Sequence, residues 1–201
     1  MFDPVGSTSW PNRHRPYLLR LDELLRREWI TPAALPLVAL IGPGAVTRFC
    51  RPLLRDAARH QARWRTLTGD LARYADQLLR RIPWLPLVSL EAQEVEAALV
   101  VPHELAVVDL SHRVLAAVAR DLPAARCARV DLSCAPIPFV ADVIIAFNVV
   151  SRIADGQAAT DRLVDALRPG GLLLMDDRSA DRFLPRARFE TIADKTHRKR
   201  D

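Results

Sequence analysis

The chain has 201 residues, half of them hydrophobic, and a mean hydropathy near zero, which suits one domain with a sizeable core. No stretch reaches the roughly 18 uninterrupted apolar residues of a membrane-spanning helix, and residues 1–12 lack the basic and apolar segments of a signal peptide, so we expect a cytoplasmic protein that does not act in a membrane. The net charge of +5 and pI of about 9.7 fit an acidic partner such as nucleic acid or a solvated basic surface, and the dispersed arginines favour the second.

The N-terminal region predicts an irregular arm followed by a helix. Turn-forming residues fill 1–15, and Pro16 suits the first turn of a helix over 16–29 with leucines at helical spacing. We therefore separate an N-terminal arm and helix, residues 1–35, from the main domain, residues 36–201.

The main domain opens with a strand. The apolar run 37–41 stops at Gly42-Pro43-Gly44, a strand followed by a tight turn. From Val46 the pattern becomes helical, a second helix is predicted over 70–81, and a third short helix over 91–99. Residues of about 50–102 thus read as a helical insertion.

Strands and helices then alternate. Strands are predicted at 105–109, 128–130, 141–147 and 172–175, with helices at 113–119 and 158–167; the turn Arg168-Pro-Gly-Gly171 ends the second helix. This alternation predicts an α/β, Rossmann-like, mostly parallel sheet with helices on both faces.

Ligands of such sheets bind outside the carboxyl ends of the strands. Four of the five strand ends carry a polar or acidic side chain, and the first carries glycines that let backbone approach a ligand. Each signal alone has a plain structural alternative, such as an aspartate that caps the next helix. Together they are typical of a nucleoside-binding crevice: Gly42 and Gly44, Asp109, Asp131, Asn148 after Phe147, and Asp176 with Asp177.

Residues 104–177 resemble the second half of a class I S-adenosylmethionine-dependent methyltransferase. The resemblance rests on the strand and acid of 105–109, on the segments Arg129–Ser133 and Ile137–Val150, and on the proline–glycine–glycine turn within Leu167–Met175. It implies S-adenosylmethionine as cofactor, with Leu110 and Leu132 packing on the adenine. The donor-binding residues it implies are Gly42, Pro43, Gly44, Asp109, Leu110, Asp131, Leu132 and Phe147.

The sequence departs from this family at the glycine turn. Leu40 stands where the family has an acidic residue, and Val46 where it has a third glycine. The family also continues past its fifth strand with a helix and an antiparallel hairpin, whereas here one strand, 189–192, precedes a basic tail. The sheet is therefore expected to lack its last strand, expose an edge or complete itself in a homodimer, with the insertion or the C-terminal strand at the interface.

No catalytic dyad stands out, which is compatible with methyl transfer because positioning matters most. Candidates facing the acceptor are Asn148, Arg152 and Asp176. His14 lies in an arm that could fold over the pocket, although a surface or capping histidine is the simpler interpretation. No His, Cys or Asp pair has metal-ligand spacing, so no metal is predicted.

Three functions remain open. The first is methyl transfer to a small-molecule acceptor, the second is methyl transfer to RNA or protein, and the third is a non-catalytic, methyltransferase-like partner subunit. The segment Phe147-Asn148-Val149-Val150 lacks the Asn/Asp-Pro-Pro-aromatic signature that many enzymes methylating exocyclic or amide nitrogens carry. This absence disfavours nucleic-acid amines as acceptors.

Overall fold

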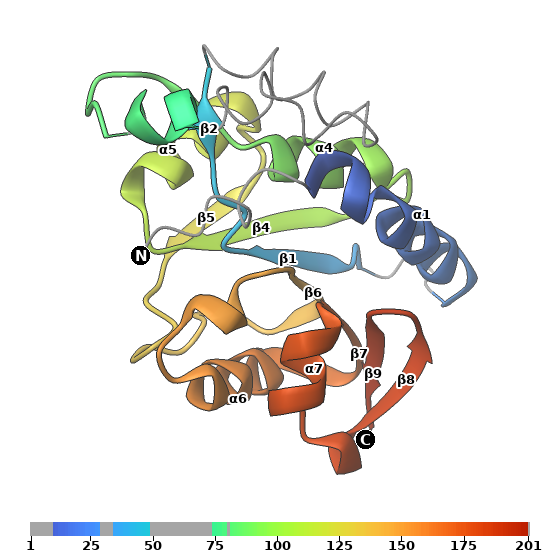
Figure 1. Ribbon diagram of the computed structural model, residues 1–201. Coiled ribbons are helices and arrows are strands. Elements are labelled where there is room, and N and C mark those ends of the chain that lie inside the picture. Colours follow the sequence, from blue (N-terminus) through green and yellow to red (C-terminus); the bar gives the residue numbers. More distant parts are fainter. Residues whose placement is uncertain (1–9, 29–33, 49–73, 80, 201) are drawn as a thin grey trace.

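The computed structural model describes residues 10–28, 34–48, 74–79 and 81–200 of the chain, and it centres on one seven-stranded sheet (Figure 1). The strands of this sheet are β1 (Leu37–Ile41), β4 (Glu104–Asp109), β5 (Arg126–Arg129), β6 (Ala141–Ala146), β7 (Leu167–Met175), β8 (Phe189–Ala193) and β9 (Thr196–Lys199).

The strand order is β5-β4-β1-β6-β7-β9-β8. β1 pairs in parallel with β4 on one side and β6 on the other, so that Leu40 lies opposite Val107 and Ile145. The order therefore reverses between β1 and β6, and at such a switch point the carboxyl ends of the strands flank a crevice. The predicted α/β, mostly parallel sheet is confirmed, and only β8 and β9 run antiparallel to their neighbours.

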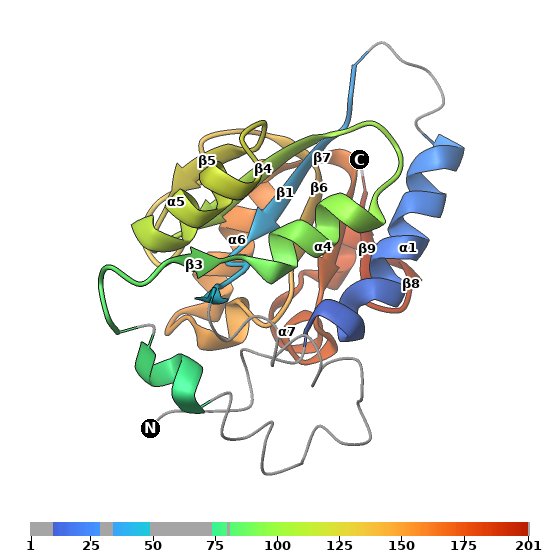
Figure 2. The same cartoon turned by 90° about the horizontal axis from the view of Figure 1, so that it is seen from above.

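Helices cover both faces of the sheet (Figures 1 and 2). The central strands β1 and β6 are apolar except for Asp142 because both of their faces are buried. Alternate residues of β1, β6 and β7 share one core with one set of helices and a second core, on the opposite face, with the other set. The first set comprises α1 (Trp10–Glu28), α4 (Leu90–Ala98) and α5 (His112–Asp121), and the second α6 (Gly156–Ala166) and α7 (Asp177–Phe183).

The N-terminal helix starts earlier than its sequence pattern predicts. α1 begins at Trp10, and Pro16 lies inside it and not in its first turn. A proline there removes one intrahelical hydrogen bond, and packing compensates: Leu18, Leu21 and Leu25 are at most 1% exposed. α1 is thus part of the main core.

The segment that follows the glycine turn is a strand where a helix was predicted. Val46–Thr47 forms β2 and pairs antiparallel with β3 (Leu87–Val88). A buried carboxylate holds it: Asp76 Oδ1 accepts hydrogen bonds from the amide (2.6 Å) and the hydroxyl (2.8 Å) of Thr47. Of the predicted helix over 70–81, residues 74–79 are helical. The rest of the helix predicted from Val46 lies outside the described residues.

The turn predicted at Arg168–Gly171 is a bulged part of β7. Ala141 pairs with Leu167, and Val143 pairs with Leu172, so the glycine segment adds extra residues to β7 between these two pairs. Gly170 takes a φ of 71° there, which suits glycine because it has no Cβ.

The expectation of a missing last strand is wrong. The basic tail forms β9, which pairs with β7 and β8 and completes the sheet. The Nζ atom of Lys199 donates a hydrogen bond of 2.8 Å to the carbonyl of Val164 near the C-terminal end of α6, where a cation is favoured. One argument for dimerisation therefore falls away.

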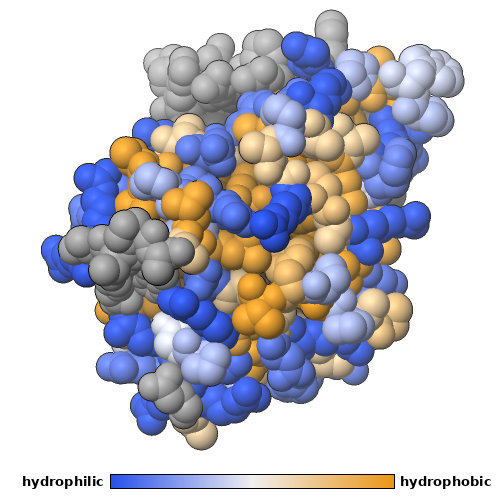
Figure 3. Space-filling model, turned by 180° about the vertical axis from the view of Figure 1, so that it is seen from behind, coloured by the Kyte–Doolittle hydropathy of each residue, from blue (hydrophilic) through white to orange (hydrophobic). Residues whose placement is uncertain are grey.

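Figure 3 shows the face opposite to that of Figure 1, where apolar residues gather near the middle. Three exposed apolar side chains, Leu35, Val100 and Val140, precede the neighbouring strands β1, β4 and β6. Among the described residues, no helix has both the length and the apolar character needed to cross a bilayer.

Candidate functional site

A cavity opens at the carboxyl ends of the central strands, at the switch point of the sheet. Its volume is about 200 Å³, and it brings together residues that follow β1, β4, β5 and β6 with residues of η2 (Val150–Arg152). Seven of the predicted site residues line it: Gly42, Asp109, Leu110, Asp131, Leu132, Asn148 and Arg152.

The glycine turn forms one wall of the cavity. Gly42 and Gly44 have φ values of 56° and 62°, which L-residues with a Cβ rarely adopt. The Gly42 amide donates to the Val108 carbonyl at 2.7 Å, and a Cβ on Gly42 would lie 2.9 Å from Val149 Cγ2. Pro43 and Gly44 do not line the cavity; Gly44 instead contributes its amide to Asp109.

Asp109 lies half-buried at the end of β4. Its Oδ1 accepts a hydrogen bond of 2.7 Å from the Ser111 amide. Burial raises the pKa of Asp109 above its ordinary value, and the amides of Ser111, Gly44 and Leu110 oppose that shift without cancelling it. The carboxylate is therefore poised to accept further hydrogen bonds, such as those of a vicinal diol.

Asp131 and Leu132 form the wall beyond β5. Asp131 accepts from the Ser133 hydroxyl at 2.6 Å and the Ser133 amide at 2.9 Å, and these bonds lower the pKa of Asp131, so it stays ionised at neutral pH. Leu132 is 6% exposed, whereas Leu110 is 56% exposed at the rim. An apolar wall beside a carboxylate suits a heterocyclic base.

The three candidates for the acceptor side have different roles. Asn148 lines the cavity and has a φ of 55°, a strained conformation for a non-glycine residue that occurs often at functional sites. Arg152 is exposed on the cavity wall. Asp176 does not line the cavity: it caps α7 by accepting from the Ser179 amide at 3.0 Å, and its other oxygen accepts from the Asn148 amide at 3.2 Å.

Phe147, predicted as a donor-binding residue, faces the opposite side of the sheet. Alternate residues of an extended segment point to opposite faces of a sheet, so Phe147 points away from the face to which Ala146 points. The ring of Phe147 stacks on that of His14, with 4.1 Å between the ring centroids. His14 is 6% exposed, so the interpretation as a surface histidine is wrong. The N-terminal helix does cover the strand ends, on the α1 and α4 side.

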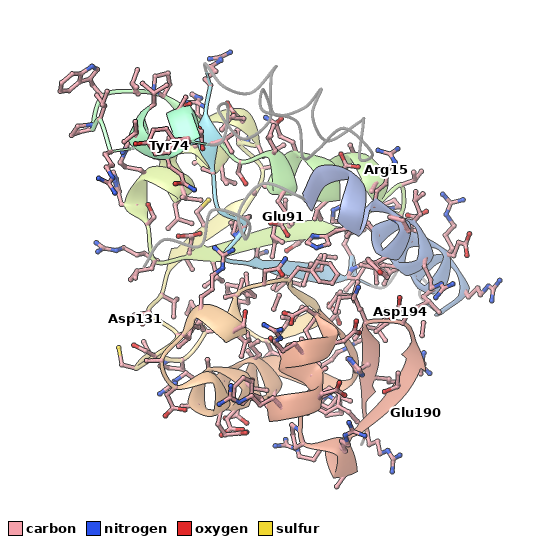
Figure 4. The ribbon with its side chains drawn as sticks, in the orientation of Figure 1. Arg15, Tyr74, Glu91, Asp131, Glu190 and Asp194 are labelled. Carbon is pink, nitrogen blue, oxygen red and sulfur yellow. The ribbon has the colours of Figure 1, made fainter. Side chains whose placement is uncertain are left out.

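Beside His14 lies Glu91, a residue that the sequence analysis passed over. Glu91 is in the first turn of α4 and is 7% exposed, and its Oε1 lies 3.7 Å from His14 Nδ1. Figure 4 shows Glu91 between α4 and the sheet, and Asp131 on the other side of the site, beyond β5. In the sequence, an acid two residues after the capping Ser89 is typical of a helix N-terminus, where it interacts with the helix dipole. The local sequence therefore gives no sign that Glu91 belongs to a site.

No protein-family model matches the sequence, and no curated protein matches it. Solved structures do match. The N-methyltransferase NodS from Bradyrhizobium japonicum WM9 superposes with a TM-score of 0.52 at 15% identity, covering 94% of this chain and 96% of that chain. The chain has the fold of class I S-adenosylmethionine-dependent methyltransferases.

Two further methyltransferase structures are more distant in shape. NodS in complex with S-adenosyl-L-homocysteine gives a TM-score of 0.44 at 16% identity, covering 90% of this chain and 73% of that one. The amino pentose methyltransferase CalS10 from Micromonospora echinaspora gives 0.45 at 15% identity, covering 85% of this chain and 52% of that one. The chain thus spans about half the length of CalS10.

Between β1 and β4 lie β2 and, in the described part of the insertion, β3 and α4. Ala92 and Val95 of α4 share a core with Leu40 of β1. The first turn of α4 brings Glu91 next to His14.

Proposed function

We propose that this chain binds S-adenosylmethionine and transfers its methyl group to a small-molecule acceptor. The observation that carries the proposal is the cavity at the switch point, where Gly42, Asp109 and Asp131 meet at the ends of three strands. NodS, the structure most alike in shape of those described above, is an N-methyltransferase.

The cavity fits the nucleoside part of this donor. Val130, Leu132 and Ile153 offer apolar contacts for a base, and Asp109 is placed to accept the hydroxyls of a ribose. At about 200 Å³, the cavity is smaller than the roughly 300–1,000 Å³ of most ligand sites. The amino-acid end of the donor must therefore extend past Gly42.

When bound, the donor supplies a sulfonium methyl carbon, which an acceptor nucleophile attacks in line. The chain's own task is to hold donor and acceptor in that geometry. A strong nucleophile loses its proton to water, so no side chain need act as a base. Asn148, on the cavity wall nearest β6, is our candidate for orienting the acceptor.

Nucleic acid is the less favoured acceptor because the arginines are dispersed along the chain and not gathered in one block. Among the described residues, the arginines that form ion pairs with neighbouring acids are Arg15, Arg26, Arg120, Arg126, Arg168 and Arg186. We expect little binding to mixed RNA at about 50 mM salt. Strong binding that weakens steeply with added salt would favour an RNA acceptor.

The proposal is tested by titration calorimetry with S-adenosylmethionine and S-adenosylhomocysteine. We expect both to bind, and Asp109→Ala to weaken binding about 10- to 100-fold, because hydrogen bonds to a charged group contribute about 1.5–3 kcal/mol. Asp161→Ala, on the exposed side of α6, is the control and should bind like the unaltered chain. Absence of heat and of thermal shift with both compounds at millimolar concentration would point to a non-catalytic partner subunit.

A further inference from the structure

The pair formed by Glu91 and His14 has no assigned role in the site. Both residues are more than nine-tenths buried. The distance of 3.7 Å between Glu91 Oε1 and His14 Nδ1 exceeds hydrogen-bond length. In the described part of the chain, His14 Nδ1 has no hydrogen-bond partner. Native structures rarely leave such buried groups unsatisfied, so His14 Nδ1 calls for a further polar partner.

Burial also makes the Glu91 carboxylate costly to keep charged. Burial raises its pKa, and the nearby charges of His14 and Arg152 oppose the shift only in part. The N-terminal end of α4 supplies further positive potential. A buried carboxylate becomes favourable when a cation with N–H donors binds to it.

The pair lies on the α1 and α4 side of the strand ends, beside Phe147, and does not itself line the cavity. Along the sheet, Asp131 follows β5, Asp109 follows β4, and Gly42 follows β1. A donor whose base lies at β5 and whose ribose lies at β4 therefore has its amino-acid end over β1 and β6. Phe147 directly follows β6, and its ring stacks on that of His14. Arg152 lines the cavity, and its charge lowers the pKa of Glu91 from across the strand ends.

The residue at position 40 explains why a helix supplies this carboxylate. Leu40 is fully buried on the α1 and α4 side of β1, in one core with Ala92 of α4 and with Phe147. The acid expected two residues before Gly42 is thus absent. Glu91, which precedes Ala92, places a carboxylate against the same face of the sheet from the opposite layer.

We propose that Glu91 binds the ammonium group of the donor's amino-acid end and that Arg152 binds its carboxylate, with His14 positioning Glu91. This inference rests on the proposed function. It makes Glu91 and Arg152 the residues by which the chain distinguishes a complete aminoacyl-adenosyl donor from a compound that carries only the adenosyl thioether.

The test compares S-adenosylhomocysteine with 5′-methylthioadenosine, which has the same adenosine and thioether but no amino-acid end, by titration calorimetry. Glu91→Gln should weaken binding of S-adenosylhomocysteine at least 10-fold and change that of methylthioadenosine less than twofold. Glu96→Gln, a half-exposed glutamate of the same helix, should change neither. Arg152→Gln should also weaken S-adenosylhomocysteine selectively, and because Arg152 is exposed, this variant keeps the test valid if Glu91→Gln folds poorly.

The outcomes separate the two proposals. If the unaltered chain binds neither compound, the donor assignment fails and this inference fails with it. A second outcome is that the unaltered chain binds S-adenosylhomocysteine and methylthioadenosine, while the Glu91 and Arg152 variants lose affinity equally for the two compounds, or for neither compound. In that case the donor assignment stands and the role of Glu91 and Arg152 is refuted. Selective loss of S-adenosylhomocysteine in both variants supports the inference.

Discussion

The glycine turn offers two substitutions with the same backbone strain and different surroundings. Gly42 and Gly44 both have positive φ, at 56° and 62°. A Cβ at Gly42 would lie 2.9 Å and 3.3 Å from the two methyl carbons of Val149, whereas a Cβ at Gly44 would meet nothing within 4 Å. Replacement by alanine should therefore strain the backbone at both positions and create a collision only at Gly42.

The magnitudes follow from these two effects. A left-handed conformation costs an L-residue about 1–2 kcal/mol, offset in part because alanine reduces the entropy of the unfolded chain by about 0.4–1 kcal/mol. We expect Gly44→Ala to cost about 1 kcal/mol. Overpacking adds about 1–3 kcal/mol, so Gly42→Ala should cost about 2–4 kcal/mol. In a chain of this size, each 1 kcal/mol lowers Tm by about 2–4 °C.

Urea unfolding of the two variants measures the difference, and a double-mutant cycle with Val149→Ala identifies its source. The shorter side chain removes the colliding methyl groups, so Gly42→Ala in the Val149→Ala background should cost about as much as Gly44→Ala. Because Val149 also lines the cavity, Gly42→Ala should weaken S-adenosylhomocysteine binding more than Gly44→Ala does. Equal costs for the two glycine substitutions, or a cycle without coupling, would refute the packing of Val149 on Gly42.

Two further predictions concern the N-terminal helix and the oligomeric state. Asp22 Oδ1 accepts from the Val100 amide (2.7 Å) and the Val101 amide (2.8 Å); burial raises the pKa of Asp22, but these bonds and Arg26 outweigh it and lower the pKa below the ordinary value. The stabilisation by Asp22 is therefore complete above about pH 4 and is lost as the pH falls through the lowered pKa. Asp22→Asn should lower the free energy of unfolding by about 1.5–3 kcal/mol at pH 7 and by progressively less in acid; a loss independent of pH would contradict this. We also expect a homodimer, since the exposed strand β8 still offers a pairing edge. A monomer mass from light scattering at tens of micromolar would rule the dimer out.

Some features of the site follow from local sequence. An apolar run of five residues that ends in Gly-Pro-Gly predicts β1 and its turn, because glycine adopts the positive φ found at Gly42 and Gly44 more readily than residues with a Cβ. Asp109 follows an apolar run in the same way. Since the carboxyl ends of neighbouring parallel strands meet at one edge, the alternation of strands and helices and the polar strand ends together predicted most of the cavity wall.

Other features depended on contacts between distant segments. The basic tail has no strand-like alternation, and it becomes β9 because β7 offers an unpaired edge and α6 offers carbonyls to Lys199. Val46 and Thr47 form a strand because Asp76, about 30 residues further along the chain, binds Thr47. No local pattern encodes either partner.

The difference between what the sequence determined and what the tertiary structure decided is clearest at the strand ends of the site. Sequence alone determined that a run of buried strands would end in glycines and acids, since hydrophobic periodicity and turn chemistry are local properties. Only the tertiary structure decided which way Phe147 points and that Glu91 and His14 meet beside it. Their proximity results from the packing of α1 and α4 on one face of the sheet, which depends on the burial of the whole apolar core.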